Sequence, residues 1–119
     1  MLNQKMDRSE NIETTYSKTK TELDKKLSIQ GYSILIEEYN KESFGSRFCV
    51  WTNQEDKFAI RLIWDGRDSW FILEESPYTT TNGQFAWADV AIIPFNSSKF
   101  EESYSTEIAK AIAQELKND

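Results

Sequence analysis

The chain has 119 residues, 39% hydrophobic and 29% charged, and its 20 acidic and 14 basic residues give a formal net charge of -6. This length suits one domain with a single core, and seven Phe, five Tyr and four Trp are too many aromatic residues for a disordered chain. The acidic balance argues against binding to nucleic-acid phosphates, and no apolar run approaches the roughly 20 residues that span a bilayer.

The domain is expected to cover residues 1–119, with a frayed end at residues 1–10. The N-terminal residues lack the apolar segment and the small-residue cleavage site of a signal peptide. The single Cys49 excludes an intramolecular disulfide and gives no reason to expect an oxidising compartment. These features predict a soluble cytoplasmic protein with no membrane association.

An amphipathic helix is expected to begin after residue 10. Ile12, Tyr16, Leu23 and Leu27 recur at helical spacing among polar residues, which indicates one narrow buried stripe. Gly31 suits the position just past the helix end, because glycine readily adopts the left-handed conformation found there.

The apolar pattern then changes to the period of two that is typical of strands. Four runs rich in β-branched and aromatic residues are separated by short polar turns, which predicts neighbouring antiparallel strands. The four runs are 32–39, 47–52, 58–64 and 69–75. A polar loop at 76–84 and a fifth strand within 85–95 follow, and Pro94 places that strand at a sheet edge or at its own end.

A second helix is expected near the C-terminus. Ser98 and Glu101 match a capping box, and Phe100, Tyr104, Ile108, Ile112 and Leu116 follow at helical spacing. Together these elements predict an α+β fold, a five-stranded antiparallel meander sheet with the N-terminal and C-terminal helices packed on one face. One helix on each face is the alternative arrangement.

Two turns set the expected faces of the sheet. A four-residue loop at 65–68 pairs Leu62 with Phe71, and a five-residue loop at 53–57 pairs Trp51 with Ala59. The face expected under the helices then contains Ile34, Ile36, Phe48, Val50, Phe58, Ile60, Leu62, Phe71 and Leu73. The opposite face contains Leu35, Cys49 and Ile72 together with the candidate partner-binding residues Glu37, Tyr39, Trp51, Arg61, Ile63, Trp70 and Glu74.

This second face has the composition of a protein-binding hot spot, in which Trp, Tyr and Arg are enriched. The alternative is that arginine stems and the threonine-rich loop cover the tryptophan rings within the chain itself. No catalytic residue, metal site or cofactor is predicted, because the sequence has no His, one Cys and no glycine-rich phosphate loop. The turn Asp65-Gly66-Arg67-Asp68 lacks the ligand spacing of a calcium loop.

Three functions remain open at this point. The chain is similar in kind to small acidic α+β immunity proteins of bacteria, although no motif assigns it to one family, and this likeness implies another protein as partner, such as a basic toxin or effector domain. The second hypothesis is a chaperone or adaptor for a secreted effector. The third is a small-ligand-binding protein or enzyme with a pocket lined by Trp51, Trp70 and Trp87. The oligomeric state stays open.

Overall fold

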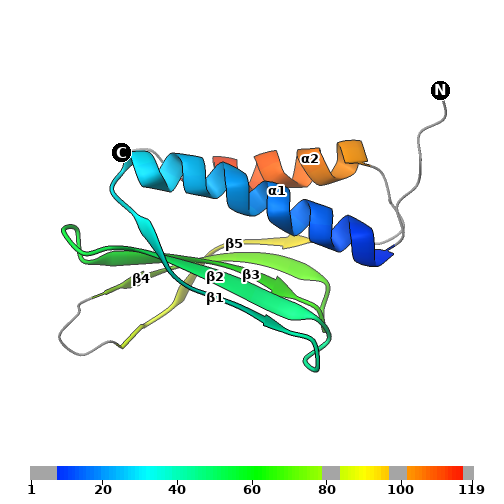
Figure 1. Cartoon of the computed structure of the whole chain (residues 1–119), viewed down its shortest axis with the longest axis horizontal. Helices are drawn as coiled ribbons and strands as arrows, with labels where there is room; N and C mark the ends of the chain where they lie inside the picture. The colour runs from blue at the N-terminus through cyan, green and yellow to red at the C-terminus, as the bar shows by residue number, and fades with distance from the viewer. Residues whose placement is uncertain (1–7, 79–83, 97–101, 117–119) are drawn as a thin grey trace.

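The computed structural model describes residues 8–78, 84–96 and 102–116. Two helices lie side by side over one face of a five-stranded antiparallel sheet, and the strands follow one another as a meander, β1-β2-β3-β4-β5 (Figure 1). The predicted α+β fold and the placement of both helices on one face are therefore confirmed.

Helix α1, Arg8–Ile29, packs on the sheet through the predicted stripe. Ile12, Tyr16, Leu23 and Leu27 are all buried. The helix includes residues 8–10, which were expected to be frayed, and residues 1–7 lie outside the described chain. It ends at a turn in which Gly31 has a φ of 92° and the Tyr32 N–H donates to the Leu27 carbonyl.

Helix α2, Glu102–Gln114, packs against both α1 and the sheet. Ile108, Ile112 and Ala113 are buried in the same core as the α1 stripe. The Lys26 Nζ of α1 donates to the Ala113 carbonyl at 2.8 Å, which supplies a partner for a carbonyl in the last turn of α2. The predicted capping box of Ser98 and Glu101 lies outside the described residues.

The sheet has five strands of seven or eight residues each. They are β1 Ser33–Asn40, β2 Ser46–Asn53, β3 Phe58–Asp65, β4 Trp70–Pro77 and β5 Ala88–Pro94. Strand β5 forms one edge of the sheet and ends at Pro94, as predicted, because proline has no N–H to donate to the ladder. Strand β1 forms the other edge.

The pairing of β2 with β3 differs from the prediction by one residue. Trp51 pairs with Ile60 instead of Ala59, because the loop has four residues, 54–57, and Asn53 still belongs to β2. The Asn53 side chain accepts a hydrogen bond from the Asp56 N–H and donates to the Gln30 carbonyl, so this polar residue holds the turn from within the strand. A shift of one residue moves every β2 side chain to the other face.

The core face is therefore not the one predicted for β2. Cys49 and Trp51 are fully buried under the helices, whereas Phe48 and Val50 lie on the opposite face. Strand β1 has a register shift between Ile34 and Ile36, which separates these two residues, predicted to share the core face. The sheet side of the core consists of Cys49, Trp51, Ile60, Leu62, Trp64, Phe71 and Leu73, with Phe95 beyond β5.

The pairing of β3 with β4 differs from the predicted register by two residues, and the side chains of both strands still point to the predicted faces of the sheet. The loop has the predicted four residues but occupies 66–69, so Leu62 pairs with Leu73 and Arg61 with Glu74. Because side chains alternate with a period of two, Leu62 and Phe71 remain on the helix side, and Arg61 and Ile63 remain on the other.

Gly66 lies where the β3–β4 turn meets the β1–β2 turn. A Cβ atom at Gly66 would lie 1.9 Å from the Phe44 carbonyl oxygen, so Gly66→Ala must force the two turns apart. We expect this change to lower the free energy of unfolding by about 1 to 3 kcal/mol, as overpacking does, measured by urea denaturation. The control is Arg67→Ala in the same turn, expected to change stability by less than about 0.5 kcal/mol. Equal stability of the two variants would contradict the contact.

Candidate functional site

The sheet face that points away from the helices, called the open face below, has no helix over it among the described residues (Figure 1). The register aligns four apolar side chains across it, one from each of β2, β3, β4 and β5. This apolar row consists of Phe48, Ile63, Ile72 and Ile92. Its first three members are half-buried, and Ile92 is 44% exposed.

Trp70 extends the apolar row toward the end of the sheet where β4 begins. It pairs with Asp65 on β3 and with Pro94 on β5, and its side chain is 38% exposed. Ile36 adds a further exposed apolar group on β1, opposite Val50. An exposed surface of this kind is typical of a protein contact, since an isolated domain gains nothing from leaving large apolar groups in water.

Arg61 and Glu74 form an ion pair at the centre of the open face. They are directly opposite in the register, and Arg61 Nε donates to Glu74 Oε1 at 2.7 Å. The guanidinium carbon also lies 4.3 Å from the centre of the Trp87 ring. Both side chains are largely buried, and Glu74 neutralises the charge of Arg61. Arg61 therefore does not offer a free positive charge to a partner.

Part of the open face is covered by aromatic residues that precede β5. Tyr78, Phe85 and Trp87 stack in succession, with ring centres 5.3 Å and 4.7 Å apart. They pack on Val50 and Ala59. The predicted alternative was that arginine stems and the threonine-rich loop cover the tryptophan rings. The structure instead shows aromatic rings covering Val50 and Ala59 at this end of the open face, and the apolar row and Trp70 lie at the other end. The sequence signal for this cover was the presence of Tyr78, Phe85 and Trp87 on either side of the polar loop. Residues 79–83 of that loop lie outside the described residues.

The structure brings together four of the seven predicted partner-binding residues. Arg61, Ile63, Trp70 and Glu74 all lie on the open face. Trp51 was placed wrongly, because it is fully buried under α1, where its indole N–H donates to Asp24 at 3.0 Å. It therefore lies on the opposite side of the sheet from Trp70, and the three tryptophans of the predicted ligand pocket do not line one cavity.

Glu37 and Tyr39 were also placed on the wrong face. They pair with Cys49 and Arg47, which point toward the helices. Glu37 accepts two hydrogen bonds from Lys20 of α1, and the Tyr39 ring lies 4.4 Å from the Arg47 guanidinium carbon. The one-residue shift of β2 accounts for both errors, since it carries the paired strand β1 with it.

Strand β1 is a second exposed element. Every one of its residues is exposed, including Ile34, Leu35, Ile36 and Tyr39. An edge strand of this kind presents backbone groups that another extended segment can pair with. The bulge between Ile34 and Ile36 interrupts the regular ladder near the start of the strand.

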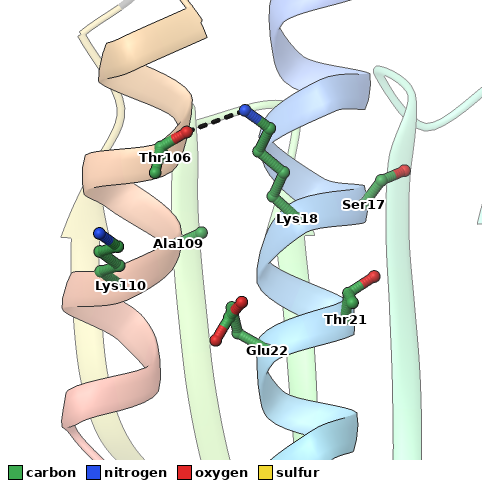
Figure 2. Close-up of a pocket in the computed structure, with 7 residues that line it drawn as sticks. All are labelled: Ser17, Lys18, Thr21, Glu22, Thr106, Ala109 and Lys110. Atoms are coloured by element: carbon green, nitrogen blue, oxygen red, sulfur yellow. Dashed lines mark hydrogen bonds between the residues drawn. The ribbon is translucent and has the colours of Figure 1, made fainter.

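A groove runs between the two helices on the side away from the sheet. Figure 2 shows Lys18 reaching from α1 to Thr106 on α2, and its Nζ donates to the threonine hydroxyl at 2.8 Å. The groove has a volume of about 360 Å³ and is lined by Ser17, Lys18, Thr21, Glu22, Thr106, Ala109 and Lys110. The sequence has no histidine, so no imidazole lies beside these hydroxyl groups to act as a base.

The buried Cys49 lacks the environment of a reactive thiol. Burial, with a smaller contribution from Glu37, raises its pKa to about 12, so the thiol carries its proton at neutral pH. Within residues 8–78, 84–96 and 102–116, no three or more Cys, Asp or Glu side chains are grouped to hold a metal ion. Neither described helix is long and apolar enough to cross a membrane.

Comparison with known proteins gives no relative from which a function could be transferred. No family model matches the chain, and neither the curated proteins nor the solved structures include a significant match.

Proposed function

We propose that this protein is a non-catalytic protein-binding module that uses the uncovered part of its open face. The observation that carries the proposal is the apolar row beside Trp70, which no described helix covers. Trp and the branched aliphatic residues supply large binding energies when a partner removes them from water. The Arg61–Glu74 pair and the aromatic stack lie beside this surface on the same face of the sheet.

The partner we propose is a basic protein domain. The chain carries a net charge of -6, and the register places Glu38, Asp65 and Asp89 around the apolar row and Trp70. The basic residue of this surface, Arg61, is already neutralised by Glu74. A partner that carries an apolar patch surrounded by Lys and Arg would therefore complement the open face. Because the partner would be basic and this chain is acidic, their attraction would speed association.

The specific role we propose is that of a bacterial immunity protein, which binds and inhibits a basic toxin in the cytoplasm. The small acidic fold, the lack of histidine and the single buried cysteine all suit such an inhibitor. A chaperone or adaptor for a secreted effector is the second candidate, and the fully exposed edge strand β1 favours it, because that edge can accept an extended segment.

Trp70→Ala is the test of the open face. In affinity capture from the native cell, the unchanged chain and an Ile29→Ala control, altered at an 86% exposed residue of α1, should retain the same basic protein, and Trp70→Ala should lose it. With the purified partner, Trp70→Ala should weaken binding roughly thirtyfold, which corresponds to about 2 kcal/mol in calorimetry. Equal affinity of both variants would exclude the open face as the contact surface.

Salt dependence separates the two candidate partners in the same experiment. Association with a folded basic toxin should slow markedly as ionic strength rises, because screening weakens long-range attraction. Capture of an apolar extended segment by β1 should change little with salt and should be insensitive to Trp70→Ala.

A further inference from the structure

A second pocket lies on the other side of the sheet, between α1 and the edge strand β1, away from the open face. Its volume is about 310 Å³, and side chains from three elements line it. The residues on which the argument depends are Glu13, Tyr16 and Lys20 of α1, Glu37 and Tyr39 of β1, and Arg47 of β2.

Two buried donors in this pocket have no hydrogen-bond partner among the residues that the structure describes. They are the Tyr16 hydroxyl and Arg47 Nε. Tyr16 as a whole is 5% exposed. Buried polar groups are nearly always paired in folded proteins, because leaving one unpaired costs free energy. Two such donors from different elements, belonging to residues that line one pocket, can both donate to an acceptor that enters it.

Of the two cations that line the pocket, Lys20 and Arg47, Arg47 has the weaker carboxylate partner. Glu37 is already paired with Lys20 at 2.8 Å. Arg47 Nη1 lies 3.8 Å from the exposed Glu13 carboxylate, which is beyond hydrogen-bond distance. The Arg47 guanidinium carbon lies 4.4 Å from the centre of the Tyr39 ring and 5.4 Å from the centre of the Tyr16 ring.

The Tyr16 hydroxyl can act only as a neutral donor or acceptor at ordinary pH. Burial raises the pKa of Tyr16 above its usual value, and the neighbouring Cys49 and Glu37 raise it further. The proton therefore stays on the oxygen and is available to an acceptor. Both donor atoms are shielded from solvent, so a ligand reaches them only when a side chain at the pocket moves. Tyr39 lies against the Arg47 guanidinium and is 58% exposed on the edge strand, so it can change rotamer without disturbing the core.

We propose that this pocket binds a carboxylate group, held by Arg47 Nε and the Tyr16 hydroxyl. The planar guanidinium fork matches a carboxylate, and a singly charged group suits a site whose other cation, Lys20, is already paired with Glu37. A doubly charged phosphate would be repelled more strongly than a carboxylate by Glu13, which also lines the pocket. The carboxylate can belong to a small free acid or to a polypeptide lying along β1.

The test uses the full chain labelled with ¹⁵N and follows the arginine Nε–Hε resonances during titration with sodium acetate, with sodium chloride at equal ionic strength as the reference. The Arg47 signal should shift saturably with acetate alone. Arg61 is the internal control, because its Nε already donates to Glu74 and should not respond. Tyr16→Phe, which keeps the ring, should raise the acetate dissociation constant about tenfold.

A peptide pair distinguishes the two sources of the carboxylate. A five-residue peptide of valine and threonine is compared with the same peptide carrying a C-terminal amide. If the peptide acid binds more tightly than acetate and also shifts the amide signals of β1, the ligand is a polypeptide terminus. If it binds no more tightly and leaves β1 unchanged, the ligand is a small acid. The proposal would be overturned if sodium chloride shifted the Arg47 signal as much as sodium acetate does, or if the peptide amide bound as tightly as the peptide acid. An acetate dissociation constant that is the same in Tyr16→Phe and the unchanged chain would also overturn it.

Discussion

Trp51→Ala is expected to lower the free energy of unfolding by about 3 to 5 kcal/mol, the range for removing a large aromatic side chain from a core. Trp51 is fully buried between the sheet and α1, and its indole N–H is bonded to Asp24. The change would leave a cavity and remove the hydrogen bond to the partly exposed Asp24 carboxylate. Because small domains have a total stability of about 5 to 15 kcal/mol, we expect the variant to unfold at a much lower denaturant concentration than the unchanged chain.

The matched control is Trp70→Ala on the same sheet. Trp70 is 38% exposed on the open face, so its removal should cost no more than about 1 kcal/mol. Both variants are compared with the unchanged chain by urea denaturation followed by circular dichroism. A larger loss for Trp70→Ala than for Trp51→Ala would mean that the β2 register is wrong.

Leu62→Ala is expected to cost about 2 to 5 kcal/mol. Leu62 is fully buried at the middle of the sheet and pairs with Cys49 on one side and with Leu73 on the other. Residues of both helices belong to the same core cluster, so a cavity there cannot be filled by movement of one flexible side chain.

The adjacent residue is the control for this second prediction. Ile63 points to the open face and is half-buried, so Ile63→Ala should cost about 1 kcal/mol. The order of the two effects tests the assignment of the β3 faces, because neighbours on a strand point in opposite directions. A loss below about 1 kcal/mol for Leu62→Ala would contradict the assigned core.

The elements of this fold were predictable because their signals are local. Helix α1 was recognised from the spacing of Ile12, Tyr16, Leu23 and Leu27, all of which are buried. The short polar loops allow only antiparallel neighbours, and the meander follows from them. Both predictions depend on residues close together in the chain, where backbone geometry determines which side chains share a face.

The faces of β2 were not predictable because both of them are apolar. Phe48 and Val50 alternate with Cys49 and Trp51, so the period of two does not reveal which pair lies in the core. The decision depended on whether Asn53 belonged to the loop or to the strand. Its bonds to Gln30 and Asp56 keep it in the strand, and the first of these joins the strand to the end of α1.

The buried surface of α1 is wider than the sequence predicted, because it includes polar residues. Beside its apolar stripe, Asn11, Thr15 and Thr19 are fully buried, at a spacing of four residues. The Ser105 hydroxyl of α2 donates to Asn11 Oδ1 at 2.6 Å and lies 2.6 Å from the Thr15 hydroxyl. Polar residues at this spacing indicate a solvated face unless the partner helix is known, so the sequence predicted a narrower stripe.

The sequence by itself determined the element types, their order, the antiparallel meander and the faces of β3 and β4. On β3 the polar Arg61 separates Ile60 from Leu62, so the alternation left a single choice of face. Only the tertiary structure decided the faces of β1 and β2, the polar contact between the helices, and the aromatic stack that covers part of the open face. These features depend on hydrogen bonds and ring contacts between residues far apart in the chain, whose energies no local pattern contains.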